Sequence, residues 1–223
     1  ACPKHFAANN QELRRMATDS VVDERTLREL YLTNFEIAVT EGHPKTIMTS
    51  YNLVNGTYAN ENAHLLKDIL RDTWGFDGAV VTDWGGSNDH ALGVKNGSTL
   101  EMPAPGLDSV RELVKAVKDG KISEVDVNAR LEEFLDLVYS TTAALEKAPK
   151  TIDWDAHHAL ARKAAAESIV LLKNRGGLLP LDPKANIAVI GDFAEKPRYQ
   201  GAGSSLVNAP RVDSFREVFE ASG

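Results

Sequence analysis

The stretch G-A-V-V-T-D-W at Gly78–Trp84 decides the fold class of this chain of 223 residues. Its apolar run Ala79-Val80-Val81 is typical of a strand buried on both faces, as strands are in a parallel sheet covered by helices. Asp83 lies just beyond this run, where such a strand would leave the core. The stretch therefore predicts an α/β fold with a carboxylate at the end of one strand.

Strand-like and helix-like segments alternate around this run. The other expected strands are residues 1–6, 47–51 and 99–102, and the expected helices lie after Asp23, around Leu65–Leu70, at 88–94 and around Val110–Val117. The apolar face expected on the first helix consists of Leu27, Leu30, Tyr31, Phe35 and Ala38. This alternation gives about four strand–helix units, the order of a parallel sheet.

The spacing of these units suits a (β/α)₈ barrel of the TIM type, which has eight units and typically about 250 residues. Half a barrel would leave sheet edges open, so we expect the earlier units to be missing here or to belong to another segment. Ser123 should begin a further helix, whose apolar face is Val127, Leu131, Phe134, Leu135 and Val138. Residues 1–145 are therefore expected to form the second half of a barrel and the helix that follows it.

Residues 146–154, which include Pro149, are expected to link two domains. Beyond them, Asp155 should open an Ala-rich helix, and N-I-A-V-I-G at Asn186–Gly191 has the pattern of a buried parallel strand. Residues 155–223 are therefore expected to start a second, incomplete α/β domain.

The composition excludes several function classes. A net charge of −7 argues against nucleic-acid and anionic-membrane partners. No run of about 18 apolar residues is present, so no membrane span is expected. The lone Cys2 allows neither an internal disulfide nor a cysteine zinc cluster, and neither a metal nor a cofactor is expected. The start at Ala1 shows no signal pattern, which leaves the compartment open.

Polar and aromatic residues follow the expected strands, and in a barrel such strand ends meet at one mouth. They are Lys4-His5, Tyr51-Asn52, Asp83-Trp84 and Glu101-Met102. Charged groups and aromatic rings suit a sugar, which offers hydroxyls and an apolar face. Asp83 could attack an anomeric carbon, but its position alone equally allows a cap for the next helix. His5 alone could be structural, and Trp84 alone could serve packing.

Four motifs resemble the family 3 glycoside hydrolases, particularly their β-glucosidases. They are K-H-F-A-A-N-N-Q-E at Lys4–Glu12, M-T-S-Y-N-L-V-N-G at Met48–Gly56, V-T-D-W at Val81–Trp84 and L-E-M-P at Leu100–Pro103. V-L-L-K-N at Val170–Asn174 resembles the entry into the family's α/β-sandwich domain. Q-G-A-G-S-S at Gln200–Ser205 resembles a loop that this domain sends towards the sugar.

The resemblance implies a role for single residues. Asp83 matches the nucleophile, and Lys4 and His5 match the pair that binds the glycon hydroxyls in subsite −1. Arg15 matches a further polar contact there.

Four more positions carry implied substrate contacts. Met48 and Tyr51 match residues beside the nucleophile, and Trp84 matches the aromatic residue that flanks the leaving-group subsite. Ser204, in preference to Ser205, matches the serine of the sandwich loop.

The implied function is that of a retaining, exo-acting β-glycosidase that releases terminal β-D-glucosyl residues from glucosides or oligosaccharides. The family's glucosidases place the general acid/base Glu beyond Gly223, so further segments of the same enzyme are expected partners, and a homo-oligomer stays open. Ala7–Asn10 replaces the motif of the glucosaminide-cleaving members, which disfavours that substrate.

Two alternatives belong to other function classes. A chain without its acid could be a non-catalytic fragment or a carbohydrate-binding scaffold. I-A-V-I-G followed by G-A-G-S-S could indicate a nucleotide-binding α/β protein, but the glycines of a G-x-G-x-x-G turn are missing.

Overall fold

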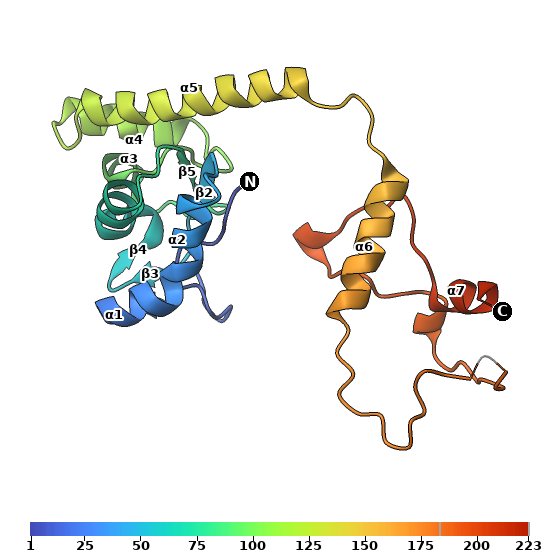
Figure 1. Ribbon diagram of the computed structural model, residues 1–223. Coiled ribbons are helices and arrows are strands. Elements are labelled where there is room, and N and C mark those ends of the chain that lie inside the picture. The colour runs from blue at the N-terminus through green and yellow to red at the C-terminus, as the bar shows by residue number, and fades with distance from the viewer. Residues whose placement is uncertain (183, 223) are drawn as a thin grey trace. The chain divides into compact units, whose positions relative to one another are not determined.

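The computed structural model describes residues 1–182 and 184–222. The chain forms two compact units, Ala1–Lys150 and Thr151–Gly223 (Figure 1). The last residue of the expected second domain, Gly223, lies outside the described residues. None of the helices in the described part has the length and apolarity needed to cross a membrane.

The first unit combines short strands with longer helices. Its elements are β1 (Asp19–Ser20), α1 (Glu24–Thr26), η1 (Leu27–Leu32), α2 (Thr33–Thr40), β2 (Thr46–Met48), β3 (Leu53–Val54), β4 (Thr57–Tyr58), η2 (Ala59–Glu61), η3 (His64–Thr73), β5 (Ala79–Val81), α3 (His90–Asn96), α4 (Leu107–Lys118) and α5 (Glu124–Lys147). The second unit contains α6 (Trp154–Ser168), η4 (Asp192–Ala194), η5 (Gly203–Ser205) and α7 (Phe215–Ala221).

A parallel sheet forms the centre of the first unit. β2 pairs with β5 in parallel, with Met48 opposite Val81. Single parallel bridges add Phe6 beside Thr49 and Leu100 beside Val81. The four segments thus lie side by side in chain order, as successive strand–helix units do in a singly wound sheet.

The first and fourth segments are bridges rather than the full strands expected at 1–6 and 99–102. At the fourth, the hydroxyl of Thr82 replaces part of the backbone ladder. It accepts from the N–H of Met102 at 2.8 Å and donates to the carbonyl of Met102 at 3.1 Å. Pairing continues through this side chain, although regular strand geometry ends at Leu100.

The core lies between this sheet and η3. Leu65, Leu66, Ile69 and Leu70 are fully buried, as their helical spacing predicts, and they join Val80 of β5 in one cluster. Each such side chain stabilises the fold by about 1.5–3 kcal/mol relative to an exposed position. The buried run Ala79–Val81 is confirmed.

The first helix begins as expected, but the face that it buries is partly different. Asp23 accepts from the N–H of Thr26 and caps α1. Leu30 is 71% exposed, whereas Leu32 and Val39 are buried. The reason is the π-helical segment η1, which has more residues per turn and rotates the following positions around the axis. The expectation for Leu30 was therefore wrong, and Ala38 is half-buried.

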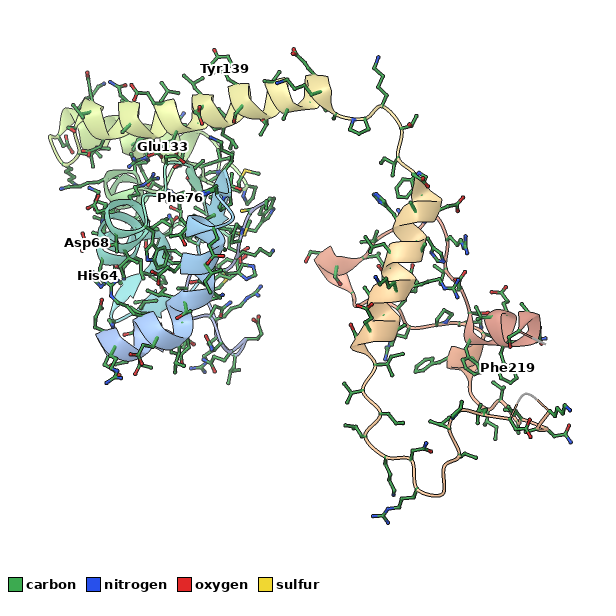
Figure 2. The ribbon with its side chains drawn as sticks, viewed as in Figure 1. His64, Asp68, Phe76, Glu133, Tyr139 and Phe219 are labelled. Carbon is green, nitrogen blue, oxygen red and sulfur yellow. The ribbon has the colours of Figure 1, made fainter. Side chains whose placement is uncertain are left out.

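The apolar face expected on α5 and two valines of α4 are largely exposed. Val110, Val114, Leu131, Leu135 and Val138 all remain open, because no segment among residues 1–182 and 184–222 covers them. α5 is held instead by polar contacts: Figure 2 shows Glu133 turned towards the body of its unit and Tyr139 turned away. Glu133 accepts from Arg71 at 3.0 Å and from Thr99 at 2.6 Å.

The linker and the second unit differ from three expectations. Asp153, rather than Asp155, caps the Ala-rich helix α6, and α5 extends to Lys147 inside the expected linker. Asn186–Gly191 forms no strand, and Ile190 is 93% exposed. A strand needs a neighbour for its backbone hydrogen bonds, and no described segment pairs with this one.

Candidate active site

The carboxyl ends of β2 and β5 bring three of the expected site residues together. Thr49 follows β2 and donates its N–H to Val81 of β5 at 2.9 Å, so the chains leave the sheet side by side. Tyr51 and Asp83 lie just beyond this point. His5 reaches the same place from the neighbouring segment at Phe6.

Asp83 is largely shielded from solvent, with 14% of its side chain exposed. Its Oδ1 accepts from the N–H of Trp84 at 2.8 Å, and its Oδ2 lies 3.4 Å from Nε2 of His5. The helix that follows is capped by Asp89, which accepts from the N–H of Leu92 at 2.9 Å. The alternative that Asp83 serves as a helix cap is therefore wrong, and its second oxygen faces the site.

His5 stands beside Asp83 as a neutral group. Burial lowers the pKa of His5, Asp83 raises it, and the charges of Lys4 and Arg15 lower it again, with a net downward shift. At neutral pH the contact with Asp83 therefore joins an uncharged imidazole to a carboxylate and is not an ion pair. Lys4 itself is exposed.

Tyr51 connects the nucleophile candidate to its loop. Its hydroxyl donates to the carbonyl of Trp84 at 2.8 Å. Burial raises the pKa of Tyr51, and the neighbouring Asp83 raises it further, so the phenol stays protonated and able to donate. The guanidinium of Arg15 lies 4.7 Å from the centre of the Tyr51 ring, a cation–π contact, and also pairs with Glu12 at 2.7 Å.

The remaining expected residues are placed less closely. Met48 ends β2 and is half-buried. Trp84 is 54% exposed, which leaves its ring free to face a ligand. Ser204 lies on η5 of the second unit, where it is exposed.

Two further carboxylates lie near these strand ends, and the sequence pattern gave no indication of the first, Glu61. Glu61 is buried and accepts backbone N–H groups from the loop after Trp84. Glu101, which the sequence placed at the end of the fourth expected strand, accepts from Ser109 at 2.8 Å and lies 2.9 Å from His90. Glu61 sits in no apolar pattern that would signal burial, so only the three-dimensional contacts reveal it.

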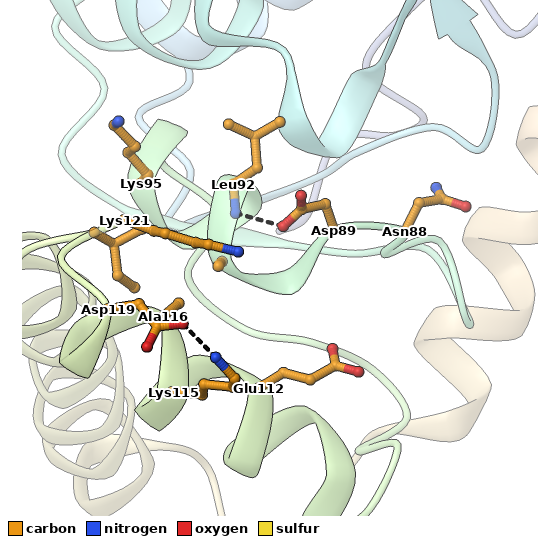
Figure 3. A pocket seen from close by; sticks show the side chains of 11 residues that line it. Asn88, Asp89, Leu92, Lys95, Glu112, Lys115, Ala116, Asp119 and Lys121 are labelled. Carbon is orange, nitrogen blue, oxygen red and sulfur yellow. Dashed lines mark hydrogen bonds and ion pairs between the residues drawn. The ribbon is translucent and has the colours of Figure 1, made fainter.

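A separate pocket of about 430 Å³ lies between α3 and α4 (Figure 3). Its charged walls are surface side chains, and Lys115 and Asp119 pair with each other there. It contains none of Asp83, His5 or Tyr51, so its position separates it from the strand-end site. In the described residues, no group of three or more His, Cys, Asp or Glu side chains converges as metal ligands do.

Family comparisons agree with the motifs at this site. The model for the glycosyl hydrolase family 3 N terminal domain matches residues 1–137, and the model for its C-terminal domain matches residues 169–222. The chain belongs to glycosyl hydrolase family 3. Membership in this family does not favour the nucleotide-binding alternative.

Curated family 3 relatives match along the whole chain. It is 49% identical to thermostable β-glucosidase B of Acetivibrio thermocellus, over 100% of this chain and 29% of that protein. It is 44% identical to an exo-α-(1→6)-L-arabinopyranosidase of Bifidobacterium longum, over 99% of this chain and 30% of that protein. The chain thus spans about 30% of the length of these relatives.

Solved family 3 structures share the fold. A β-glucosidase of Bifidobacterium adolescentis matches with a TM-score of 0.91 at 42% identity, over 98% of this chain and 32% of that one. β-Glucosidase 3B of Thermotoga neapolitana, in complex with glycerol, matches with a TM-score of 0.92 at 35% identity, over 100% of this chain and 32% of that one. Both support an α/β fold for the chain.

Proposed function

We propose that the complete protein is a retaining, exo-acting β-glycosidase that hydrolyses terminal β-D-glucosyl residues through a covalent glycosyl-enzyme on Asp83. The observation that carries the proposal is the position of Asp83 at the end of the buried strand β5. One oxygen is held by the N–H of Trp84, and the other faces His5 and the site. A carboxylate held in place in this way suits attack on an anomeric carbon.

The other residues take supporting roles in this proposal. Lys4, His5 and Arg15 bind hydroxyls of the glycon, and a neutral His5 can donate to a hydroxyl without repelling the cationic oxocarbenium-like transition state. Tyr51 and Met48 line the site beside Asp83. Support for the role of Tyr51 comes from its hydrogen bond to Trp84 and its proximity to Asp83.

Two contacts lie further from the reacting carbon. Trp84 borders the leaving group, and its exposed ring supports this role. Ser204, on η5, is the substrate contact proposed for the second domain. No metal or cofactor takes part in the proposed chemistry, because a carboxylate nucleophile and a carboxylic acid suffice for it.

The fold proposal follows the same reasoning. Residues 1–145 are the second half of a (β/α)₈ barrel with its following helix, and residues 155–223 begin an α/β sandwich after a linker at 146–154. The order of the four parallel segments supports the barrel. The remaining segments of the enzyme supply the other strands and the general acid. These segments and a β-linked glucoside are the proposed partners.

A fluorosugar tests the nucleophile directly. A 2-deoxy-2-fluoro-β-glucoside with a good leaving group slows breakdown of the glycosyl-enzyme, so the labelled peptide of the complete enzyme should contain Asp83. Proton NMR should show the β anomer as the first product, because a nucleophile and acid about 5–5.5 Å apart enforce two inversions. A label on another residue, or the α anomer first, would refute the proposal. A non-catalytic scaffold would give no label at all.

A second candidate substrate comes from the relative named as an exo-α-(1→6)-L-arabinopyranosidase. An arabinopyranoside lacks the C6 hydroxymethyl group of glucose, so the two substrates differ in what fills the glycon pocket. Rates of the complete enzyme on aryl β-D-glucoside and aryl α-L-arabinopyranoside distinguish them. Faster turnover of the arabinopyranoside would replace the glucosidase proposal while keeping the nucleophile.

A further inference from the structure

Glu61 is a buried carboxylate with two loop N–H groups as its partners. It ends η2 and is 3% exposed. One oxygen, Oε1, accepts from the N–H of Asn88 at 2.8 Å and from that of Asp89 at 3.3 Å. Burial raises the pKa of Glu61, and these two backbone donors oppose that shift without cancelling it. A buried carboxylate is costly unless it is paired, so these bonds account for its place here.

The loop that Glu61 holds runs from Asp83 at the end of β5 to α3. Its near end is fixed by three other bonds. The N–H of Gly86 donates to the carbonyl of Asp83 at 2.9 Å, the N–H of Gly85 donates to Met102 at 2.9 Å, and Tyr51 donates to Trp84 at 2.8 Å. Glu61 fixes the far end, only a few residues beyond Trp84.

The loop lies close against the site, so small movements matter. A Cβ at Gly86 would stand 3.1 Å from the carbonyl oxygen of Asp83 and 3.4 Å from the ring of Tyr51. The loop backbone at Gly86 is thus within the contact distance of one added methyl group from Tyr51, and Gly86 itself is buried. Because these bonds and contacts tie the loop along its length, a shift at Asn88 or Asp89 is expected to move the segment that carries Trp84.

We propose that Glu61 is a positioning residue for the leaving-group side of the site, acting by holding the loop that presents Trp84. This rests on the proposed function, in which Trp84 borders the leaving group. A purely structural tie between η2 and α3 already exists, because the side-chain amide of Asn96 donates to the backbone carbonyl of Glu61 at 2.7 Å. The carboxylate of Glu61 is directed at the loop instead.

The test compares two substrates of the complete enzyme. β-D-Glucosyl fluoride has a leaving group too small to reach Trp84, whereas cellobiose places a second sugar there. Glu61→Ala removes both acceptor bonds, so kcat/KM for cellobiose should fall about tenfold, since misplacement by about 1 Å can cost up to about 10²-fold. The value for glucosyl fluoride should change less than about twofold. Glu61→Gln keeps an oxygen at the Oε1 position and should restore the cellobiose value to within about threefold of wild type.

Two controls keep the outcome decisive. Ile69→Ala removes a buried core side chain that makes no hydrogen bond to the loop. If this variant lowers kcat/KM for either substrate, it should lower the value for both substrates by the same factor. If Glu61→Ala does not fold, Glu61→Asp withdraws the acceptor while keeping the charge and should show the same selective loss. Equal losses on both substrates, or no loss, would overturn the positioning role. A wild-type enzyme inactive on glucosyl fluoride would instead refute the proposed function.

Discussion

Removing the carboxylate of Asp83 should abolish turnover while leaving the fold almost unchanged. The structure shows what each variant loses. Asp83→Asn keeps an oxygen for the N–H of Trp84, and Asp83→Ala loses this one bond, worth about 0.5–3 kcal/mol depending on charge. That is a small part of a stability supported by a buried cluster around η3. Loss of the nucleophile should lower kcat by about 10⁴–10⁶-fold, as for other covalent catalysts.

Chemical rescue makes this prediction specific to a nucleophile. Asp83→Ala leaves a small space at the end of β5, into which azide can enter. With 2,4-dinitrophenyl β-glucoside, whose leaving group needs no acid, azide should restore turnover and give the α-glucosyl azide by a single inversion. Rates are measured from dinitrophenolate release, the anomer by proton NMR and the fold by thermal unfolding. A β-glucosyl azide would assign Asp83 to acid/base catalysis, and near-normal activity without azide would refute any catalytic role.

Two further perturbations follow from single contacts. The imidazole of His64 lies 2.9 Å from the carboxylate of Glu24 and 3.1 Å from that of Asp68 (Figure 2 labels His64 and Asp68). Burial lowers the pKa of His64, but the two carboxylates outweigh burial and raise this pKa overall. The contribution of His64 to stability is therefore full below its ordinary pKa and is lost as the pH rises through the raised value. His64→Gln should lower the free energy of unfolding by up to about 1 kcal/mol at about pH 5.5 and by less at about pH 8.5. An equal loss at both pH values, measured by thermal unfolding, would contradict this prediction. Ser204→Ala should lower kcat/KM for β-glucosides by a factor that corresponds to about 0.5–1.5 kcal/mol of lost binding to the transition state, or to about 1.5–3 kcal/mol if the partner of Ser204 is charged. The melting temperature should stay unchanged. An unaffected kcat/KM would show that the loop of Ser204 does not touch the sugar.

Local patterns in the sequence determined much of the first unit. The run Ala79–Val81 is buried on both faces because uninterrupted apolar residues exclude a solvent-facing side. The spacing of Leu65, Leu66, Ile69 and Leu70 specified the buried stripe of η3, and Asp23 specified the start of α1. These predictions succeeded because each depends on neighbours within one or two helical turns. The family motifs likewise identified the chain without any coordinates.

Contacts between distant segments were decided only by the tertiary structure. The π-helical turns of η1 move burial from Leu30 to Leu32, which a fixed helical period cannot anticipate. Asn186–Gly191 has a strand's composition, yet it forms no strand where no described segment supplies its hydrogen bonds. Asp83 could have been a cap or a site residue until Asp89 was found to cap α3. Glu61 is buried because the N–H groups of a loop 27 residues away satisfy it, and a partner so far along the chain leaves no trace in local sequence.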